Sequence, residues 1–345
     1  MIIIMRHGAT EEEKTHIIDR LSALGYGANV SGVEQTVIGA IGVQDRDRDN
    51  MMEGLSSLPY VERIVPVLKR YKLASIELHP QRSVVMVGDT PIGGPDIAVM
   101  AGPCSVESRD QLFTTARAVR DAGATILRGG AFKPRTSPYE FQGGGEEALR
   151  LLAAARDEFG LSIVTEVLDT HDIELVARYT DMFQIGARNM QNYALLREIG
   201  RTKMPVLLKR GGMYPTIENW LLCAEYILAE GNDRVVLCER GLPPYGDNAL
   251  RRNILDLTAV PIAKSLSHLP IVVDPSHGTG KASLVPPLSL AAVAVGADGL
   301  MIEVHPNPEM ALSDGPQSLD IPTFATLMAA LPTIAAAGGR ALVAR

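Results

Sequence analysis

From Ile97 onward, short apolar segments alternate with longer stretches of helical periodicity, and this alternation constrains the fold more than any other feature of the chain. We predict eight strands: Ile97–Ala101, Ala124–Leu127, Ser162–Val167, Met182–Ile185, Pro205–Leu208, Val235–Cys238, Ile271–Val273 and Gly299–Ile302. The helices predicted after them are Asp110–Ala122, Glu146–Glu158, Asp172–Arg178, Tyr193–Gly200, Ile217–Glu230, Asn253–Leu266, Pro287–Val295 and Ile321–Ala337. Such a run of strand–helix units is typical of a closed (β/α)8 TIM barrel. An open, doubly wound sheet is the alternative, but eight successive units fit closure better.

Polar residues follow each predicted strand, as the barrel hypothesis requires, because the active sites of such barrels lie at the carboxyl ends of the strands. These ends read Gly102-Pro-Cys-Ser105, Arg128 to Thr136, Thr165-Glu166, Gly186-Ala-Arg-Asn189, Lys209-Arg210, Glu239-Arg240, Asp274-Pro-Ser-His277 and Glu303-Val-His305. The opposite strand ends carry no comparable density of charge. The sequence therefore predicts one functional rim.

The first seventy or so residues follow a different pattern. Strand and helix patterns occur in the order β-α-β-β-α-β, which is typical of a ferredoxin-like α+β domain. The segments are Ile2–Met5, Glu11–Leu24, Ala28–Val30, Gln35–Val43, a helical stripe of Met51, Met52, Leu55 and Leu58, and Val61–Val67. We predict a ferredoxin-like domain over residues 1–70, a Pro- and Gly-rich linker over 71–95 with a hairpin at Ser83–Gly88, and the barrel over 96–345.

Composition excludes several classes of function. The formal net charge is -7 and no basic block with interleaved aromatic residues occurs, so nucleic acid is not an expected partner. The apolar run at the start is too short for a signal peptide or a membrane span, and we expect no membrane association. The three cysteines are widely spaced and predict neither disulfides nor a zinc knuckle. A reduced, cytoplasmic enzyme is the expectation.

Cations gather after the second predicted strand, where Arg128, Lys133 and Arg135 lie close to the hydroxyl groups of Thr136 and Ser137. Guanidinium forks and a lysine ammonium suit a ligand that carries both phosphate and carboxylate groups. Further cations follow later strands: Arg188, Lys209, Arg210 and Arg240. Arg210 is the weakest member, because adjacent residues of a strand point to opposite sides. So many like charges at one rim predict a bound anion at its centre.

A second set of side chains suggests a metal site. Cys104, His277 and Glu303 end or follow the first, seventh and eighth predicted strands, and Asp314 lies in the loop after the eighth. These strands are neighbours in a closed barrel, so we expect the side chains to converge. A thiolate, an imidazole and two carboxylates suit one divalent transition-metal ion, Mn²⁺ or a similar ion. Taken singly, these residues have simpler explanations: Cys104 could be a buried apolar thiol, His277 a loop cap, and Glu303 the partner of a nearby arginine.

Seven motifs together resemble those of the 3-deoxy-D-arabino-heptulosonate 7-phosphate (DAHP) synthase family. They are Ala101-Gly-Pro-Cys-Ser105, Lys133-Pro-Arg-Thr-Ser-Pro138, Gly186-Ala-Arg-Asn189, Leu208-Lys-Arg-Gly211, Cys238-Glu-Arg-Gly241, Asp274-Pro-Ser-His-Gly278 and Ser313-Asp-Gly-Pro-Gln-Ser318. They occur in order over most of Ile97 to Ile321. The N-terminal pattern resembles the subgroup in which a ferredoxin-like domain mediates feedback inhibition by aromatic amino acids.

This resemblance implies a metal-dependent condensation of phosphoenolpyruvate with D-erythrose 4-phosphate, the first step of the shikimate pathway of aromatic amino acid biosynthesis. It implies metal ligation by the set Cys104, His277, Glu303 and Asp314. Arg128, Lys133 and Lys209 would hold the phosphoenolpyruvate carboxylate and neighbouring atoms, while Arg188, Lys209 and Arg240 would bind its phosphate. Arg135, Thr136 and Ser137 would meet the aldose phosphate. Glu166 is a candidate for proton transfer.

Regulation and assembly follow from the small N-terminal domain. About seventy residues give little independent stability, so we expect this domain to pack in a homo-oligomer. The resemblance implies a tetramer, with phenylalanine or tyrosine binding between N-terminal domains.

Three alternatives remain open. The sister enzyme that makes 3-deoxy-D-manno-octulosonate 8-phosphate from arabinose 5-phosphate shares the barrel, but its substrate loop typically reads Lys-Ala-Asn-Arg-Ser-Ser where this chain has Lys133-Pro-Arg-Thr-Ser137. A non-catalytic amino-acid sensor on a decayed barrel is a second alternative, which the intact ligand set disfavours. The third is an aldolase that forms a Schiff base on Lys133 or Lys209.

Overall fold

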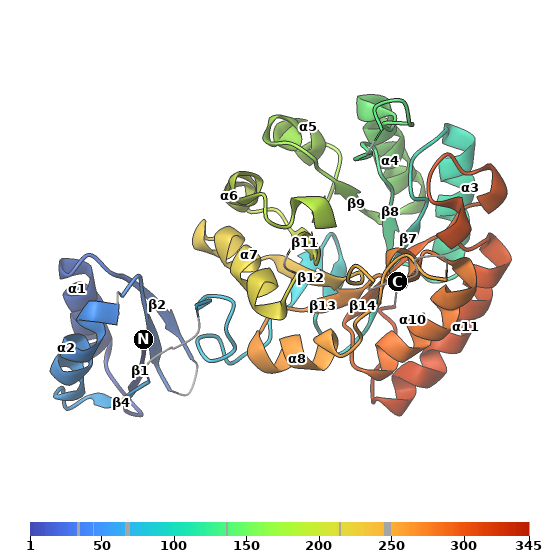
Figure 1. The fold of residues 1–345 in the computed structure, drawn as a ribbon. Coiled ribbons are helices and arrows are strands. Elements are labelled where there is room, and N and C mark those ends of the chain that lie inside the picture. Colours follow the sequence, from blue (N-terminus) through green and yellow to red (C-terminus); the bar gives the residue numbers. More distant parts are fainter. Residues whose placement is uncertain are drawn as a thin grey trace. The chain divides into compact units, whose positions relative to one another are not determined.

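A computed structural model describes residues 1–32, 35–43, 45–65, 70–135, 137–213, 215–244 and 250–344. The chain forms two compact units (Figure 1). The first comprises residues 1–82 with 266–268, and the second comprises 83–265 with 269–345. The division predicted at residues 70 and 95 stays a prediction.

The first unit has the predicted ferredoxin-like order of elements. These are β1 (Ile2–Met5), α1 (Glu11–Ala23), β2 (Gly27–Ser31), β3 (Val37–Ile41), α2 (Asp45–Ser56) and β4 (Val61–Val65). The four strands form an antiparallel sheet in the spatial order β2-β3-β1-β4. The predicted end of the last strand, residues 66 and 67, lies outside the described residues.

In helix α1, a capping box defines the first turn and an apolar stripe packs on the sheet. Thr10 accepts a hydrogen bond from the amide of Glu13, whose side chain accepts one from the amide of Thr10, which is a complete capping box. Ile17 and Leu21 recur at helical spacing and are fully buried against the sheet residues Ile3 and Ile38. The apolar stripe therefore sets which face of the helix meets the sheet.

The second unit is a closed parallel barrel of eight strands, as predicted. Its strands are β7 (Ala98–Gly102), β8 (Ile126–Arg128), β9 (Ser162–Glu166), β10 (Met182–Ile185), β11 (Val206–Lys209), β12 (Val235–Glu239), β13 (Ile271–Val273) and β14 (Gly299–Glu303). Pairing of β14 with β7 and of β9 with β10 closes the cylinder. The open-sheet alternative is therefore wrong.

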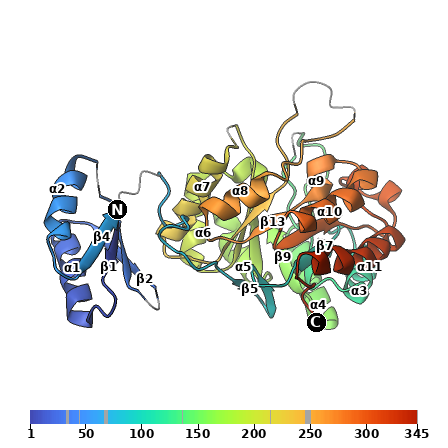
Figure 2. The same cartoon turned by 90° about the horizontal axis from the view of Figure 1, so that it is seen from below.

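Helices surround the barrel (Figure 1). They are α3 (Arg109–Asp121), α4 (Gly145–Phe159), α5 (Ile173–Ala177), α6 (Tyr193–Thr202), α7 (Ile217–Ala229), α8 (Ala259–Leu266), α10 (Val285–Ala294) and α11 (Ile321–Ala337). Figure 2 shows α10 and α11 side by side, in agreement with their contacts. None of the helices in the described ranges has the length and hydropathy needed to cross a membrane.

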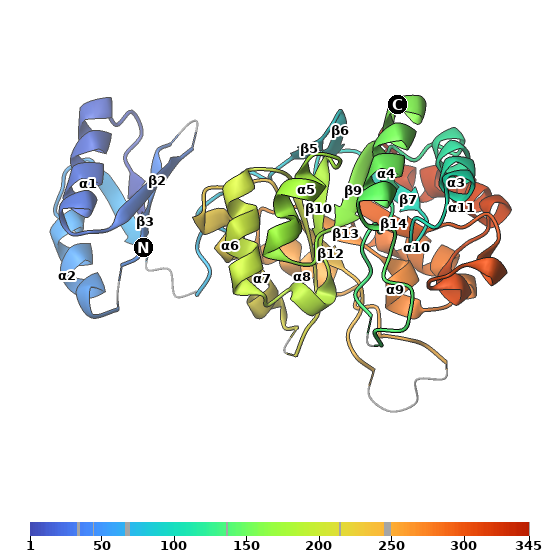
Figure 3. The ribbon, with the colours of Figure 1, turned by 90° about the horizontal axis from the view of Figure 1, so that it is seen from above.

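A hairpin closes the amino-terminal end of the barrel. Its strands are β5 (Val85–Val87) and β6 (Thr90–Ile92), which fall within the predicted linker. Val85, Val87 and Ile92 join the core cluster inside the barrel, which includes residues from every strand. The hairpin lies at the upper end of the barrel in Figure 3, whereas the short helix α9 (Pro275–Thr279) lies at the lower end. The carboxyl ends of the strands are thus left open for a functional site.

Several local predictions differ from the structure. The hairpin predicted at Ser83–Gly88 lies further along the chain, with strands at Val85–Val87 and Thr90–Ile92. The predicted helix Asn253–Leu266 begins only at Ala259, because the preceding residues bind elsewhere. Ile254 forms a bridge with Leu242, and Asn253 donates its side-chain amide to the carbonyl of His277. Helix α9 was not predicted, since its five residues are too few for a periodic pattern to emerge.

Candidate active site

A cavity of about 300 Å³ opens at the carboxyl ends of the barrel strands. Its lining is mainly polar and comes from the ends of many different strands. The lining residues are Arg128, Lys133, Pro134, Arg135, Glu140, Glu166, Gln184, Gly186, Ala187, Arg188, Lys209, Arg240, Arg252, His277, Ser313 and Asp314. Most of the residues predicted for the rim therefore meet in one place.

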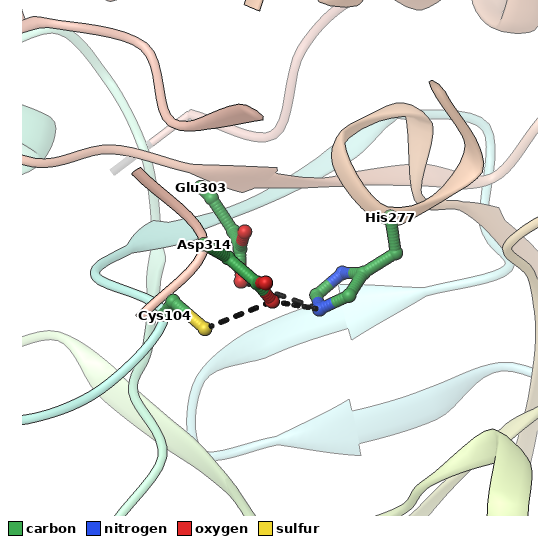
Figure 4. Close-up of side chains that lie close together, drawn as sticks. All are labelled: Cys104, His277, Glu303 and Asp314. Carbon is green, nitrogen blue, oxygen red and sulfur yellow. Dashed lines mark hydrogen bonds and ion pairs between the residues drawn. The ribbon is translucent and has the colours of Figure 1, made fainter. Parts of the chain in front are cut away.

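The structure brings the four predicted metal ligands together. One ligand atom each from Cys104, His277, Glu303 and Asp314 lies within 4.8 Å of all the others. Figure 4 shows the four side chains turned toward one another. Metal–ligand bonds of about 2.0–2.3 Å place ligands on opposite sides of an ion about 4–4.6 Å apart, so the cluster has the right size for one ion. Cys104 and Glu303 lie buried behind the cavity wall, at 2% and 0% exposure.

The charges of this cluster also suit a cation. Burial raises the pKa of the Cys104 thiol to about 12, and the carboxylate of Glu303 acts in the same direction. Burial by itself would raise the pKa of Asp314, but His277, and after it Arg252, outweigh this effect and hold that pKa at about 2. The unliganded protein therefore holds a neutral thiol between two carboxylates. A divalent ion would displace the thiol proton and neutralise both acids.

The backbone of Asp314 is adapted to this position. It has φ of 53°, in the left-handed region that few residues other than glycine adopt. Asp tolerates this region better than most side chains. One oxygen of its carboxylate lies 3.4 Å from Sγ of Cys104, and the other accepts a hydrogen bond from Arg252 at 3.0 Å. The strained turn aims the carboxylate at the cluster.

Glu303 and Arg128 form a buried ion pair next to the cluster. Nη1 of Arg128 lies 3.0 Å from Oε1 of Glu303, and the side chains are 3% and 0% exposed. Nη1 also donates to the carbonyl of Pro103 at 2.6 Å. Nε of Arg128 is buried and has no hydrogen-bond partner in the described part of the chain. An unsatisfied donor in the wall of a polar cavity is suited to a ligand.

Three other guanidinium groups of the cavity have no acidic partner among the described residues, whereas Arg252 is paired with Asp314. Within the described ranges, Arg135, Arg188 and Arg240 form no ion pairs and donate only to backbone carbonyl groups. Arg188 reaches across to the carbonyl of Pro134 at 2.9 Å. Burial lowers the pKa of Arg240 below its ordinary value, even though Asp274 acts in the opposite direction. An anionic ligand would relieve this cost.

Both lysines of the cavity are buried and held by specific partners. Nζ of Lys133 lies 3.0 Å from Sγ of Cys104 and donates to the carbonyl of the same residue at 3.1 Å. Nζ of Lys209, at the end of β11, forms an ion pair of 2.7 Å with the buried carboxylate of Asp274. Lys133 therefore contacts one of the four clustered side chains directly, whereas Lys209 is linked to another of them, His277, through Asp274.

Glu166, the last residue of β9, is one of the acids that line the cavity. Its Oε2 accepts a hydrogen bond from Gln184 at 3.1 Å. A methyl group on Gly186 would collide with its carboxylate, so the absence of a side chain there makes room for Glu166. The predicted proton-transfer residue thus faces the cavity.

Two residues of the predicted substrate-binding rim, Ser137 and Arg210, do not line the cavity. Thr136 lies outside the described residues. The hydroxyl of Ser137 accepts a hydrogen bond from the amide of Tyr139 within its own loop, and Ser137 does not line the cavity. Arg210 turns to the outer side of β11 and pairs with Glu239 and Asp256, at 2.9 Å each. Lys209 and Arg210 thus point to opposite sides, as the alternation of side chains along a strand predicted.

Sequence reasoning assigned no role to several residues of the site: Gln184, Arg252, Asp274, Ser313 and Gln317. Asp274, Ser313 and Gln317 lie within the motifs that resemble those of the DAHP synthase family, and this position was the signal for them. Arg252 lies well beyond β12 in a long loop, and no spacing marks it. It donates to both Asp314 and Gln317 at 3.0 Å.

Comparison with known proteins identifies the family. Residues 76–336 match the DAHP synthetase I family, and residues 1–69 match the DAHP synthase ferredoxin-like domain. The chain belongs to the DAHP synthetase I family. It is 49% identical over 340 residues to a phospho-2-dehydro-3-deoxyheptonate aldolase of Thermotoga maritima, covering 98% of this chain and 99% of that protein. The chain is therefore an enzyme of the DAHP synthase type.

One further relative and two solved structures also match the chain. A 2-dehydro-3-deoxyphosphooctonate aldolase of Geobacter sulfurreducens is 31% identical, over 72% of this chain and 97% of its own length. A crystal structure of the Thermotoga maritima DAHP synthase has a TM-score of 0.78 and 47% identity over 99% of both chains. A truncated form of that enzyme matches with a TM-score of 0.74 and 48% identity, over 79% of this chain and 99% of that chain. This DAHP synthetase I family member is thus similar to the heptonate enzyme over nearly its whole length, and to the octonate enzyme over a smaller part.

Proposed function

We propose that this enzyme condenses phosphoenolpyruvate with D-erythrose 4-phosphate and water to give 3-deoxy-D-arabino-heptulosonate 7-phosphate and inorganic phosphate. The observation that carries the proposal is that a metal-ligand cluster and several uncompensated guanidinium groups adjoin the same cavity of an acidic chain. A substrate pair bearing two phosphates, a carboxylate and an aldehyde matches that combination.

In this proposal, different cations of the cavity bind different groups of the two substrates. Arg128 and Lys133 hold the carboxylate of phosphoenolpyruvate, with the unsatisfied Nε of Arg128 as one donor. Arg188, Lys209 and Arg240 bind its phosphate. Arg135 binds the phosphate of the aldose at the outer part of the cavity, and the part of Thr136 and Ser137 in this contact stays a prediction.

The chemistry follows from how the two substrates are held. C3 of phosphoenolpyruvate forms a bond to the aldehyde carbon, and positive charge develops at C2. Water adds at C2, and the resulting phosphohemiketal releases phosphate by cleavage of the C2–O bond. Glu166 faces the cavity and accepts a proton from the attacking water, while Gln184 orients its carboxylate. The ammonium of Lys133, which lies next to Cys104, stabilises negative charge at that end of the cavity.

One divalent ion held by Cys104, His277, Glu303 and Asp314 would act as a Lewis acid on the aldehyde carbonyl. Lys133 and Arg128 keep the cluster from accumulating negative charge before the ion binds. His277 presents Nε2 to Glu303 at 3.3 Å and to Asp314 at 3.9 Å. Elemental analysis of the purified enzyme tests whether the bound ion is Mn²⁺.

A turnover assay tests the proposal. The purified enzyme is incubated with phosphoenolpyruvate and either erythrose 4-phosphate or arabinose 5-phosphate, and phosphate release is followed. We expect turnover with the four-carbon aldose, loss of turnover with a chelator, and recovery with Mn²⁺. Preference for arabinose 5-phosphate would transfer the chain to the octulosonate activity. Trapping of a lysine adduct by borohydride would instead indicate a Schiff-base aldolase.

We further propose that phenylalanine or tyrosine inhibits the enzyme through the N-terminal domain and that the enzyme is a homo-tetramer. The match of residues 1–69 to the DAHP synthase ferredoxin-like domain supports this regulatory role. Inhibition assays with each amino acid, together with light scattering, test both statements. A monomer insensitive to both amino acids would contradict them.

A further inference from the structure

Asp274 links two residues that line the cavity, Lys209 and His277. It is the first residue after β13 and the N-cap of α9, and it is fully buried. Its Oδ2 lies 2.7 Å from Nζ of Lys209 and also 2.7 Å from Nδ1 of His277. Its Oδ1 accepts a hydrogen bond from the backbone amide of His277 at 2.9 Å. One carboxylate therefore contacts a proposed phosphate ligand and a proposed metal ligand.

The contact with His277 determines which nitrogen faces the metal-ligand cluster. When Nδ1 carries the proton and donates it to Asp274, the lone pair of the neutral ring is on Nε2. Nε2 is the nitrogen that lies near Glu303 and Asp314. Carboxylate partners of this kind orient metal-ligating histidines and make them more basic.

The contact with Lys209 provides a buried ammonium with a partner and holds it in place. The side chain of Lys209 is only 4% exposed, and a buried charge without a partner is costly. Asp274 uses one of the three N–H donors of the ammonium, which leaves the others for a ligand in the cavity. Asp274 and Lys209 thus form a buried ion pair that fixes the position of the ammonium.

We infer that Asp274 is a positioning residue shared by the metal-binding and phosphate-binding parts of the cavity. This inference rests on the function proposed above. Through His277 it supports metal affinity, and through Lys209 it supports affinity for phosphoenolpyruvate. The competing explanation is that Asp274 only caps helix α9.

Replacement of Asp274 by Asn separates these two explanations. Asparagine is as good an N-cap as aspartate, so the contact of Oδ1 with the His277 amide is retained. The amide has no charge, however, and its second terminal atom is a donor that cannot accept from either Lys209 or His277. Asp274→Asn therefore removes the shared contact and leaves the cap.

Calorimetric titrations measure the two affinities separately. Mn²⁺ is titrated into the metal-free enzyme, and phosphoenolpyruvate is titrated in the presence of a chelator. We expect Asp274→Asn to raise the Kd for Mn²⁺ by about 10–100-fold. We expect it to raise the Kd for phosphoenolpyruvate by about tenfold.

Double mutants show through which group each effect passes. In a His277→Ala background, Asp274→Asn should cause no further loss of Mn²⁺ affinity. In a Lys209→Met background, it should cause no further loss of phosphoenolpyruvate affinity. A purely structural role would lower both affinities in either background, because it would act through the fold.

Asp298 provides a matched control. It is a buried aspartate, 5% exposed, that lies 2.7 Å from a lysine, Lys264, but it precedes β14 at the opposite end of the barrel. Asp298→Asn should lower the midpoint of thermal unfolding and leave both affinities within about twofold of wild type.

The outcomes are distinguishable. If wild type binds both ligands and Asp274→Asn changes either affinity by less than about twofold, the shared role is wrong. Effects of Asp274→Asn that persist undiminished in both double mutants would also overturn it. If wild type binds neither Mn²⁺ nor phosphoenolpyruvate, the proposed function fails and this inference fails with it.

Discussion

Replacement of Arg128 by Met should destabilise the metal-free barrel by about 3 kcal/mol. The pair that it breaks is 3.0 Å long and almost fully buried. Two unit charges at this distance attract by about 5–6 kcal/mol at an effective dielectric constant of about 20, and loss of one partner of a buried pair costs about 3–5 kcal/mol. Glu303 keeps its contacts with His277 and Gln317, so we expect the lower end of that range.

The pH dependence follows from the ionisation of Glu303. Burial raises its pKa, but His277 and Arg128 together hold it below the ordinary value of 4.5. Stabilisation by a depressed carboxyl is fully present above the unfolded-state pKa and is lost as the pH falls through the folded-state pKa. The stability difference between wild type and Arg128→Met is therefore largest near neutral pH and shrinks as the pH is lowered.

The single tryptophan makes the assay specific for the barrel. Trp220 lies on α7, is fully buried, and donates its indole N–H to the carbonyl of Leu208. Its fluorescence during urea unfolding in a chelator reports the free energy of unfolding of this unit alone. Arg128→Lys is the matched control, since it keeps the positive charge beside Glu303 and should lose less stability than Arg128→Met.

A divalent ion provides the second arm of this experiment. Mn²⁺ bound beside Glu303 would neutralise the carboxylate that Arg128→Met leaves unpaired. We therefore expect Mn²⁺ to stabilise the variant more than it stabilises wild type. A loss below about 1 kcal/mol in the chelator would refute the energetic reasoning about the buried pair. Equal stabilisation of both proteins by Mn²⁺ would refute the placement of the ion beside Glu303.

Three further predictions concern other parts of the chain. Cys104→Ala should weaken Mn²⁺ binding by more than about 100-fold in calorimetry and abolish most turnover, with an unchanged circular dichroism spectrum; full activity in metal-free buffer would contradict the ligand assignment. Asp320→Ala should remove the N-cap of α11 and cost about 1 kcal/mol in urea unfolding. Hydrogen bonds from Thr323 lower the pKa of Asp320, so this cost should disappear as the pH falls through that pKa, and a constant cost would argue against it. Deletion of residues 1–70 should leave turnover intact and abolish inhibition by aromatic amino acids, and a truncated enzyme that is still inhibited would contradict the proposed regulatory role.

The fold was accessible from the sequence because its signals are local and repeated. Each barrel strand is a short apolar run, and the helices carry apolar stripes at helical spacing, so that the order of elements alone implied closure. Where a local pattern was absent, prediction failed. The start of α8 was placed too early because the contacts of Asn253 and Ile254 with distant segments do not appear in the spacing of apolar residues.

The candidate site was accessible in part for a related reason. Residues such as Arg128, Glu166, Lys209 and Glu303 directly end a strand, and all strands of a parallel barrel end at the same rim. Their assembly in or beside one cavity therefore followed from topology. The alternation of side chains along a strand likewise predicted that Lys209 and Arg210 point to opposite sides of β11.

The amino-acid sequence by itself determined the closed barrel, the ferredoxin-like unit and which strand ends meet at one polar rim, because these depend on periodicity and chain order. Only the tertiary structure decided that Asp274 contacts both Lys209 and His277, that Arg252 returns from a long loop to Asp314, and that Ser137 binds within its own loop. Such contacts depend on how loops fold back over a closed sheet. No local pattern encodes the direction of a side chain across that distance.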